Sequence, residues 1–439
     1  MKDLGHFSPR AIQPPVMKQM NQLSLLALIM ENGPISRTGL ARLSQLSKPT
    51  VSAQVESLIR KRLVLETGAG ESGRRGGKKP TQLEFNADYG SLAVGEIDPL
   101  EIRLAVTDLK GAMIAQAQFP TEAQLGAASV TGRLKHGLGK LLKQSGRTEQ
   151  LCQIAIAAPG RVDVRHGVIL EAGNIFNWEN VPIADSLATV FKAPVHVDND
   201  LNLAALAEMN YGAAEGVEDF VLVCHHTGIG CGVVLGGKLH RGSNWAAGEI
   251  AHLVLDLSQA GKNWNPRGYL ELQVSADRLS ERIHRGQALH KMLPRFMDGG
   301  GELAALFRVW KHGHAAAGKI VTDLVLHLGI AIAHIAATYD PSLIVLQGEI
   351  FPPLLEDIEQ VVRRTLPWQP RLAVSRLGKD AALRGAIVAA RALAHEEIAR
   401  ALNEGATQSR SKADSESGLD DRMSYPLGAR GLVSHYGAG

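Results

Sequence analysis

Apolar positions recur at helical spacing in three short stretches near the N-terminus. From Met17 the run MKQMNQLSLLALIMENG places Met20, Leu23, Leu26, Leu28 and Ile29 at near-helical spacing and ends at Gly33-Pro34. Ser36 can cap a second helix, SRTGLARLSQL, and Ser47 can cap a third, KPTVSAQVESLIRKR, whose Pro49 falls in the tolerated first turn. Helix, helix, short turn and helix is the pattern of a helix-turn-helix domain.

The third of these helices has one apolar and one polar side. Val51, Val55, Leu58 and Ile59 are expected to face the core. The polar positions expected to meet DNA are Ser47, Lys48, Thr50, Ser52, Gln54 and Arg60.

The stretch after the third helix, LVLETGAGESGRRGGKKPTQLEF, predicts two short strands around a basic, Gly-rich loop. Arg74, Arg75, Lys78 and Lys79 lie in six residues with only glycines between them, so they can follow a phosphate backbone or enter a minor groove. A charge run in isolation is more often a solvated loop. After three helices of suitable length, it is better interpreted as the wing of a winged helix.

From Asn86 onwards the periodicity changes to that of strands. SLAVGEIDPLEIRLAVTDLKGAMIAQAQF predicts strands separated by turns, with a hairpin at Asp108 to Gly111. A helix is expected over 123–148, a strand over Gln153–Gly160, and a helix beginning at Pro182. Residues Ser275 to about Glu404 are predicted to be mostly helical apart from a strand near Ile344.

Length and charge indicate more than one domain and a difference in charge between the N-terminal domain and the rest of the chain. A chain of 439 residues and 47.0 kDa is too long for one compact core, so two or three domains are expected. Residues 1–90 hold 13 Lys and Arg against 7 Asp and Glu, whereas the rest holds 34 against 37. A basic head on a slightly acidic body indicates a polyanion partner for the head.

The cysteines and the apolar runs predict a cytoplasmic protein without a membrane span. Cys152, Cys224 and Cys231 have no paired spacing and are interpreted as reduced, buried thiols. The N-terminus has no apolar core of signal-peptide length, and the most apolar later stretch, Val321–Tyr339, is interrupted by Asp323, His327 and His334.

The stretch from Thr227 to Glu271 carries the candidate chemistry. It opens with a Gly-rich turn, TGIGCG, in which small residues let backbone N–H groups approach a phosphate or a sugar. Glu249, His252 and Glu271 follow in an otherwise apolar context, and two carboxylates with one imidazole suit a ligand with several hydroxyls. His225, His226 and His240 show no metal-ligand spacing and are interpreted as structural or exposed.

Taken together, TGIGCG, GEIAH and GYLE resemble the ROK family of bacterial sugar kinases and sugar-responsive transcription factors. The segment from Asn21 to the GRRGGKKP loop is similar to the winged helix of ROK regulators. The resemblance implies an α/β protein: a winged helix-turn-helix followed by an actin-like (ribonuclease H-like) two-lobed ROK domain. The domains expected are a flexible leader (1–16), the winged helix (17–86), lobe 1 (90–200), lobe 2 (201–404) and a disordered tail (405–439).

The same resemblance implies a set of sugar contacts. Asn174 falls in the family's N-x-x-x-W region, and VHVDNDLN corresponds to the E-N-D-A-N motif, which gives Asn199 and Asp200 sugar-binding positions. Asp200 matches the base that deprotonates the acceptor hydroxyl in the kinases. Asp-Asn-Asp at a strand end is also a common helix cap, and only its company with Glu249, His252 and Glu271 favours the ligand interpretation.

Two departures from the family pattern bear on function. The three zinc-binding cysteines of the family are Lys262, Trp264 and Tyr269 here, so no zinc and no cofactor are expected. The first phosphate loop, D-I-G-G-T-K in the kinases, is Glu96-Ile97-Asp98-Pro99-Leu100-Glu101, and Gln347 and Glu349 replace glycines on the adenosine side. Asp98 adds a charge that repels phosphate, and Pro99 removes an N–H donor.

A chain that keeps the sugar contacts and loses the nucleotide loops is predicted to be a sugar-responsive transcriptional regulator and a repressor rather than an enzyme. Its expected partners are operator DNA, a monosaccharide or sugar phosphate, and further copies of itself in a homodimer or homotetramer. The main alternative is an active ATP-dependent sugar kinase with a DNA-binding domain. A third is a DNA-binding architectural protein with an inert body, against which the retained polar contacts argue.

Overall fold

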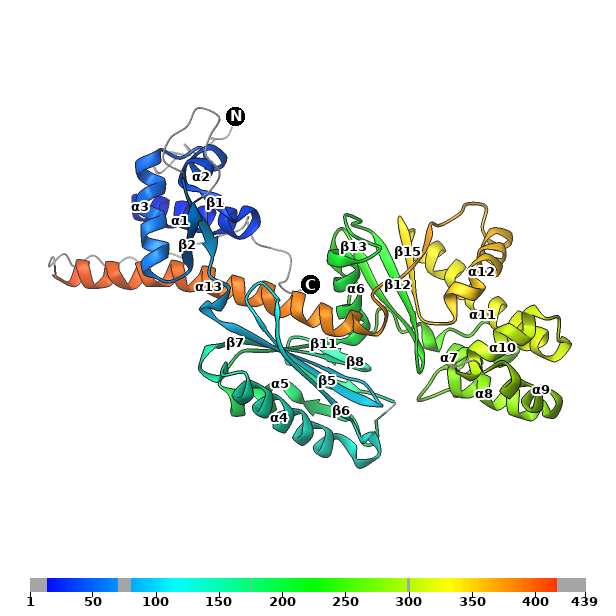
Figure 1. Cartoon of the computed structure of the whole chain (residues 1–439). Coiled ribbons are helices and arrows are strands. Elements are labelled where there is room, and N and C mark those ends of the chain that lie inside the picture. Colours follow the sequence, from blue (N-terminus) through cyan, green and yellow to red (C-terminus); the bar gives the residue numbers. More distant parts are fainter. Residues whose placement is uncertain (1–13, 70–79, 174, 298–300, 417–439) are drawn as a thin grey trace, which may run out of the picture. The chain divides into compact units, whose positions relative to one another are not determined.

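The structure is a computed structural model that describes residues 14–69, 80–173, 175–297 and 301–416 (Figure 1). These residues form two compact units. Unit 1 comprises the chain up to Ser91, the turn Asp108–Ala112, and the residues from Arg391. Unit 2 comprises Leu92–Thr107 and Met113–Ala390.

Unit 1 contains the helix-turn-helix that the sequence predicts. Its helices are α1 (Pro14–Asn32), α2 (Arg37–Ser44) and α3 (Lys48–Arg60), and its sheet has the order β1-β3-β2, from Ile35–Ser36, Thr81–Phe85 and Val64–Ala69. The Ser36 hydroxyl accepts the Gly39 N–H and the Ser47 hydroxyl accepts the Thr50 N–H, so both predicted caps are confirmed. The wing residues Arg74, Arg75, Lys78 and Lys79 lie outside the described residues.

The core of unit 1 corrects one predicted DNA contact. Val51, Val55 and Leu58 are fully buried as expected, but Gln54 is only 6% exposed, whereas Ser52 and Arg60 are exposed. Positions 51, 54, 55 and 58 form the i, i+3, i+4, i+7 stripe of a helix, so Gln54 faces the core by geometry. In α1, Leu25, Leu26 and Ile29 are buried and Met20 is 51% exposed.

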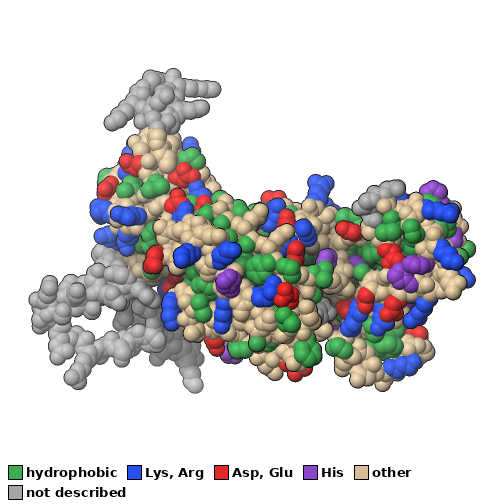
Figure 2. Space-filling model, turned by 60° about the horizontal axis from the view of Figure 1, so that its bottom comes forward, with side chains coloured by type: hydrophobic (Ala, Val, Ile, Leu, Met, Phe, Trp, Pro, Cys, Tyr) green, Lys and Arg blue, Asp and Glu red, His purple; other side chains and the backbone are tan. Residues whose placement is uncertain are grey.

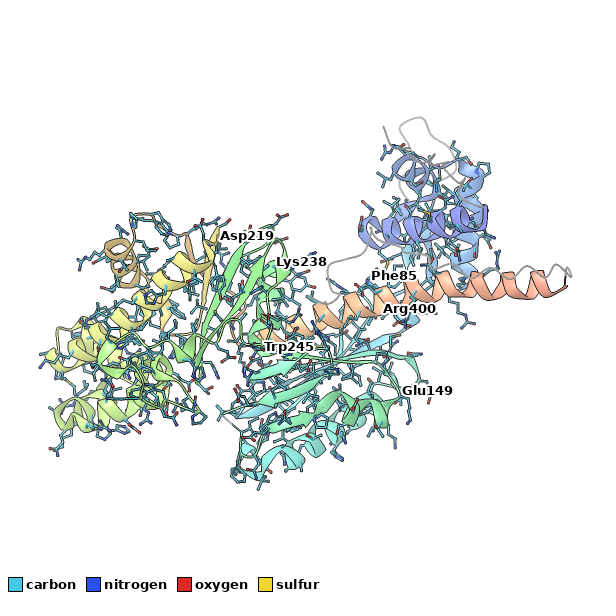
Figure 3. All side chains as sticks on the ribbon, turned by 180° about the vertical axis from the view of Figure 1, so that it is seen from behind. Phe85, Glu149, Asp219, Lys238, Trp245 and Arg400 are labelled. Atoms are coloured by element: carbon cyan, nitrogen blue, oxygen red, sulfur yellow. The ribbon has the colours of Figure 1, made fainter. Side chains whose placement is uncertain are left out.

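The last helix belongs partly to unit 1, which corrects the predicted domain boundary. Helix α13 (Ala381–Glu416) continues past residue 404, where a disordered tail was expected to begin. Within unit 1, the His395 Nε2–H donates to the Leu109 carbonyl (2.9 Å), and the His395 ring meets edge-on the ring of Phe85, which is labelled in Figure 3. The Gln19 amide donates to the Asn403 carbonyl at 2.8 Å, which joins α13 to α1. The part of this helix up to about residue 404 was predicted, and the part beyond it was not, because that sequence is polar and has little helical periodicity.

Unit 2 begins with an α/β lobe. Its five-stranded sheet has the order β11-β7-β4-β5-β6, from Val195–Asn199, Leu151–Ala158, Ser91–Ile97, Glu101–Asp108 and Met113–Pro120. The predicted hairpin between β5 and β6 is confirmed. Helices α4 (Gly126–Gln144) and α5 (Ile183–Phe191) bury apolar side chains against this sheet, and β8 (Arg161–Asp163), β9 (Val168–Glu171) and β10 (Glu179–Pro182) form a small separate sheet.

The second lobe repeats a five-stranded sheet. Its order is β14-β13-β12-β15-β16, from Lys238–Leu239, Ile229–Leu235, Phe220–His225, Leu343–Gln347 and Leu372–Val374. Helices α11 (Ala315–Tyr339) and α12 (Phe351–Thr365) share a core with one face of this sheet. Helix α6 (Asp200–Tyr211) packs against the glycines of β13 on one face of the sheet. The residues that alternate with these glycines, Ile229, Cys231 and Val233, point to the opposite face and belong to the lobe core.

The remaining helices of this lobe come between β14 and α11 in the sequence. They are α7 (Tyr269–Val274), α8 (Ala276–Arg285), α9 (Gln287–Met292) and α10 (Glu302–Lys311), with 3-10 turns at Ile250–His252, Leu257–Gln259 and Leu293–Phe296. Among the described helices, α11 alone is long and apolar enough to cross a membrane. Its Val321, Leu324 and Leu328 are buried in the lobe core, as in a core helix of a folded domain.

Candidate functional site

A cleft of about 770 Å³ opens in unit 2 and is lined by residues of both lobes. Of the predicted sugar contacts, Asn199, Asp200, Glu249, His252 and Glu271 all line it. Residues separated by up to 72 positions in sequence therefore meet in one cavity of the size typical for small-molecule sites. Asn174 lies outside the described residues.

Asn199 ends β11 and caps α6. Its Oδ1 accepts the Leu201 and Asn202 N–H groups at 2.9 and 3.1 Å, and its amide donates to the Gly160 carbonyl at 2.9 Å. The helix-cap interpretation of this motif is therefore correct for the Asn199 side chain. Its capping role fixes the start of α6, which carries Asp200 into the cleft.

Asp198 supports this turn and was missed from the sequence. Its fully buried carboxylate accepts the Arg241 guanidinium at 2.6 Å and the Asn202 amide at 3.1 Å. Burial opposes ionisation of Asp198, but its contacts with His196 and Arg241 outweigh that effect and lower its pKa. The acidic and polar run at the end of the strand was a sequence signal for a functional turn. The pairing of Asp198 with Arg241, which lies 43 residues away, had no such signal.

Asp200 is the most perturbed acid in the cleft. Burial against the lobe core, followed by repulsion from Glu96, raises its pKa from 3.8 to about 8. Burial likewise raises the pKa of Glu96 to about 7, although Arg103 lies 2.6 Å from that carboxylate. The raised pKa of Asp200 favours its protonated form, which can donate as well as accept a hydrogen bond.

Glu249 precedes the 3-10 turn Ile250–His252, and His252 ends it. Burial raises the pKa of Glu249, while the nearby His252 and Arg161 act in the other direction. Gly248 must be glycine: its φ is +94°, and a Cβ would lie 1.9 Å from the Cys231 carbonyl. That contact holds the turn against β13 and sets the direction of the Glu249 side chain.

Glu271 lies in the first turn of α7 and is bound by an arginine that sequence reasoning missed. The Arg267 Nε donates to Glu271 Oε1 at 2.6 Å, and Arg267 Nη2 donates to Asp277 at 2.9 Å. The carboxylate also lies against the Gly-rich turn, since a Cβ on Gly228 would lie 2.3 Å from Glu271 Oε2. The spacing of four residues between Arg267 and Glu271 was a usable signal for this pair.

The TGIGCG turn is explained by packing as well as by access to a ligand. A Cβ on Gly230 would meet Leu201, and one on Gly232 would lie 2.5 Å from the Leu201 carbonyl. These two glycines therefore let α6 approach β13, while Gly228 faces the cleft. Trp245, which is labelled in Figure 3, also lines the cleft, and the Arg165 guanidinium lies 5.5 Å from its ring.

The turn that replaces the first phosphate loop uses its own N–H groups. The Asp98 N–H donates to the Glu101 carbonyl at 3.0 Å and the Leu100 N–H donates to Asp98 Oδ1 at 2.8 Å, while Pro99 has no N–H. Nothing at these three positions is left to cradle a phosphate. A phosphate oxygen would instead meet the Asp98 carboxylate, at a cost of roughly 4 kcal/mol at 4 Å and a near-surface dielectric.

Two further groups occupy the nucleotide side of the cleft. Arg103 contacts Glu96, Asp380 (3.1 Å) and the Lys379 carbonyl, so its charge is already matched by carboxylates. Gln347 ends β15 and donates to the Gly378 carbonyl at 2.7 Å, where a glycine would leave space.

In the segment that corresponds to the family's zinc ligands, ring packing and a side-chain hydrogen bond hold the chain. Trp264 and Tyr269 meet edge-on with ring centroids 5.3 Å apart, and the Lys262 amine donates to the Gln259 side chain at 2.8 Å. Neither an ammonium, an indole nor a phenol supplies the thiolates of such a site, so these residues do not fit that zinc.

The polar face of α3 is the described part of the candidate DNA interface. Ser47, Lys48 and Ser52 are exposed and Thr50 is half-buried, with its hydroxyl 2.8 Å from that of Ser47. Their contact with DNA stays a prediction.

Comparison with known proteins agrees with this architecture. The ROK family profile matches residues 94–393 and a MarR family profile matches residues 17–75. A "Putative xylose repressor" of Caldicellulosiruptor sp. is 27% identical over 390 residues, covering 85% of this chain and 95% of that protein. A "Glucokinase" of Halalkalibacterium halodurans is 31% identical, covering 65% of this chain and 90% of that protein.

Among solved structures, a ROK family transcriptional regulator described as a homologue of the Escherichia coli Mlc protein has a TM-score of 0.69 and 25% identity, covering 88% of this chain and 98% of that one. The predicted fold class is thereby confirmed, with a winged helix-turn-helix ahead of an actin-like two-lobed domain. The chain is a member of the ROK family with an N-terminal MarR-type winged helix.

Proposed function

We propose that this protein is a sugar-responsive, DNA-binding transcriptional regulator that acts as a repressor in the cytoplasm. The observation that carries the proposal is the division within the cleft. One side presents Asp200, Glu249, His252 and Glu271, whereas the turn at Asp98-Pro99-Leu100 offers no phosphate cradle. Full-length relatives named as xylose repressors support the same function.

The effector we propose is a neutral monosaccharide. Arg267 and Arg161 lie beside the polar set, but Arg267 is bound to Glu271 and Asp277, and Arg161 donates to Glu171 at 2.8 Å. With these cations matched, the surplus of carboxyl groups disfavours a phosphate and suits hydroxyls. A sugar phosphate is the competing effector and would have to displace at least one of these ion pairs.

Asn199, Asp200, Glu249, His252 and Glu271 are the proposed contacts, and Asn174 joins them by the family motif. Burial and repulsion from Glu96 favour the protonated form of Asp200, which can exchange hydrogen bonds with a sugar hydroxyl, so we propose that it acts as a binding group. The turn at Asp98-Pro99-Leu100, rather than the pKa of Asp200, is what argues against phosphoryl transfer. The domain is accordingly proposed to be a sensor without kinase activity.

Sugar binding is proposed to change lobe closure and thereby operator affinity. Helix α13 is one of the covalent connections between the units, since it begins at Ala381, next to the cleft residue Ala382, and its residues from Arg391 belong to unit 1. The DNA-binding form is proposed to be a homodimer or homotetramer, with half-sites one or two helical turns apart.

A thermal-shift screen of monosaccharides and their phosphates tests the proposal. A neutral sugar at 100 times its Kd should stabilise the protein by about 2.7 kcal/mol. A response confined to sugar phosphates would refute the neutral effector, and the absence of any response would refute the sensor.

The second candidate function is a sugar kinase, favoured by the glucokinase relative and by the position of Asp200. It requires sugar-dependent ATP consumption by the purified protein, whereas the sensor predicts none.

A further inference from the structure

A cluster of three potential metal ligands lies in unit 2, apart from the residues that line the cleft. His284 is in the last turn of α8, His290 in the last turn of α9, and Glu302 begins α10. One ligand atom from each side chain lies within 4.8 Å of the other two. Figure 2 shows histidines grouped with charged side chains at the end of the molecule that holds these helices.

The geometry is close to that of a bound cation. His284 Nε2 lies 2.9 Å from Glu302 Oε1, and the rings of His284 and His290 have centroids 4.4 Å apart at an interplanar angle of 78°. Zinc bonds to His nitrogen and carboxylate oxygen at about 2.0–2.2 Å, so two ligand atoms of a tetrahedral ion lie roughly 3.4 Å apart. Small rotations of these partly exposed side chains bridge the difference.

We propose that His284, His290 and Glu302 bind a divalent transition-metal ion, with zinc as the best fit. Two imidazoles and one carboxylate are a borderline-soft set that suits zinc and leaves one position for water. Each imidazole can offer a ring-nitrogen lone pair to the ion. The ion joins α8, α9 and α10, which are separate elements in the sequence.

This site is distinct from the one that the sequence excludes. The expected absence of zinc rests on Lys262, Trp264 and Tyr269, and none of the three new ligands belongs to that segment. The competing explanation is a simple His284–Glu302 ion pair, which needs neither a metal nor His290. The role of His290 is therefore what the experiment must test.

Calorimetric titration of the full-length, EDTA-treated and dialysed protein with ZnCl₂ provides the test. Wild type should bind one equivalent more zinc than His290→Ala, or bind it at least about tenfold more tightly. His290 is exposed, so its removal should leave the melting temperature of the metal-free protein unchanged. MgCl₂ should not compete, because Mg²⁺ prefers oxygen ligands.

His166→Ala is the matched control, since His166 also pairs with a carboxylate (Asp163, 2.7 Å) and is exposed. It should bind zinc as wild type does. Equal zinc binding by His290→Ala and wild type would overturn the proposal, as would loss of binding in His252→Ala with retention in His290→Ala.

Discussion

Asp200 shows at the residue scale how the surroundings of a carboxyl group change its hydrogen bonding. Burial and the neighbouring Glu96 raise the pKa of Asp200 to about 8, which favours its protonated form. A protonated carboxyl group offers a donor and an acceptor to sugar hydroxyls. The same perturbation makes stability depend on pH.

Asp200 should destabilise the fold increasingly as pH rises. Its pKa is 3.8 in the reference state and about 8 in the folded protein, so the folded protein binds the extra proton between these values. Its contribution is therefore most favourable below about pH 4 and is lost as pH rises towards 8. Asp200→Asn should raise the melting temperature at pH 8 by at least about 2 °C and have a smaller effect at pH 5.

Differential scanning calorimetry of both proteins at the two pH values measures this effect. Asp198→Asn is the informative contrast, because the lowered pKa of Asp198 predicts loss of stability instead. A uniform shift for Asp200→Asn at both pH values would contradict the assigned protonation.

Replacement of Glu249 or His252 should remove the sugar response. Glu249→Gln keeps the shape of the side chain and His252→Ala truncates an exposed residue, so the winged helix should stay folded. Loss of one charged hydrogen bond should weaken sugar binding by about 1.5–3 kcal/mol, or roughly 10- to 150-fold. Operator affinity without sugar should be unchanged; a matching loss of operator affinity would indicate a structural role instead.

The sequence predicted which residues line the cleft better than it predicted their side-chain contacts. Glu249, His252 and Glu271 line one cavity as their spacing and family pattern predict. Gln54 was wrong because its polarity was given more weight than its place on the apolar stripe of α3. Arg241 escaped notice because its partner Asp198 lies 43 residues away in the sequence, whereas Arg267 and Arg103 have partners four and seven residues away whose spacing was not used.

At the scale of elements, local signals fixed most boundaries. Ser36 and Ser47 cap α2 and α3, and apolar runs separated by turns mark β4 and β5. The end of α13 beyond residue 404 was missed because its sequence is polar and has little helical periodicity. Strand β16 was missed because three residues give no usable periodicity.

The wing is the element whose charge carries the DNA prediction. Arg74→Ala/Arg75→Ala should weaken operator binding and reduce the slope of log K against log salt by about 1.8, because each phosphate contact contributes roughly 0.9. Fluorescence anisotropy over a salt series measures both quantities.

Lys140→Ala/Lys238→Ala removes the same charge from exposed positions of unit 2 and should leave the slope unchanged. Equal slopes for the wing variant and wild type would remove the loop from the interface.

At the scale of the whole molecule, the account joins a sugar site to a DNA-binding domain through free-energy linkage. If a sugar lowers operator affinity by some factor, operator DNA must lower sugar affinity by the same factor. Calorimetric sugar titrations with and without operator should therefore match the ratio of operator affinities with and without sugar. A mismatch would show that the two sites are not coupled in one complex.

The two-domain organisation followed from charge distribution and motif order, whereas the exact division did not. The turn Asp108–Ala112 and the residues from Arg391 group with the N-terminal unit. Neither segment carries a sequence signal for that grouping, since the turn joins two strands of the ROK domain and the residues from Arg391 continue a helix that begins in it.

The most direct measurement of the central claim is operator affinity with sugar, with ATP and with both, using an operator selected from random duplexes and a sugar that gives a thermal shift. Sugar alone should change operator affinity at least about fivefold. ATP should change operator affinity neither in the absence nor in the presence of sugar, and no ADP should be formed. Sugar-dependent ADP formation with an unaltered operator affinity would contradict the central claim.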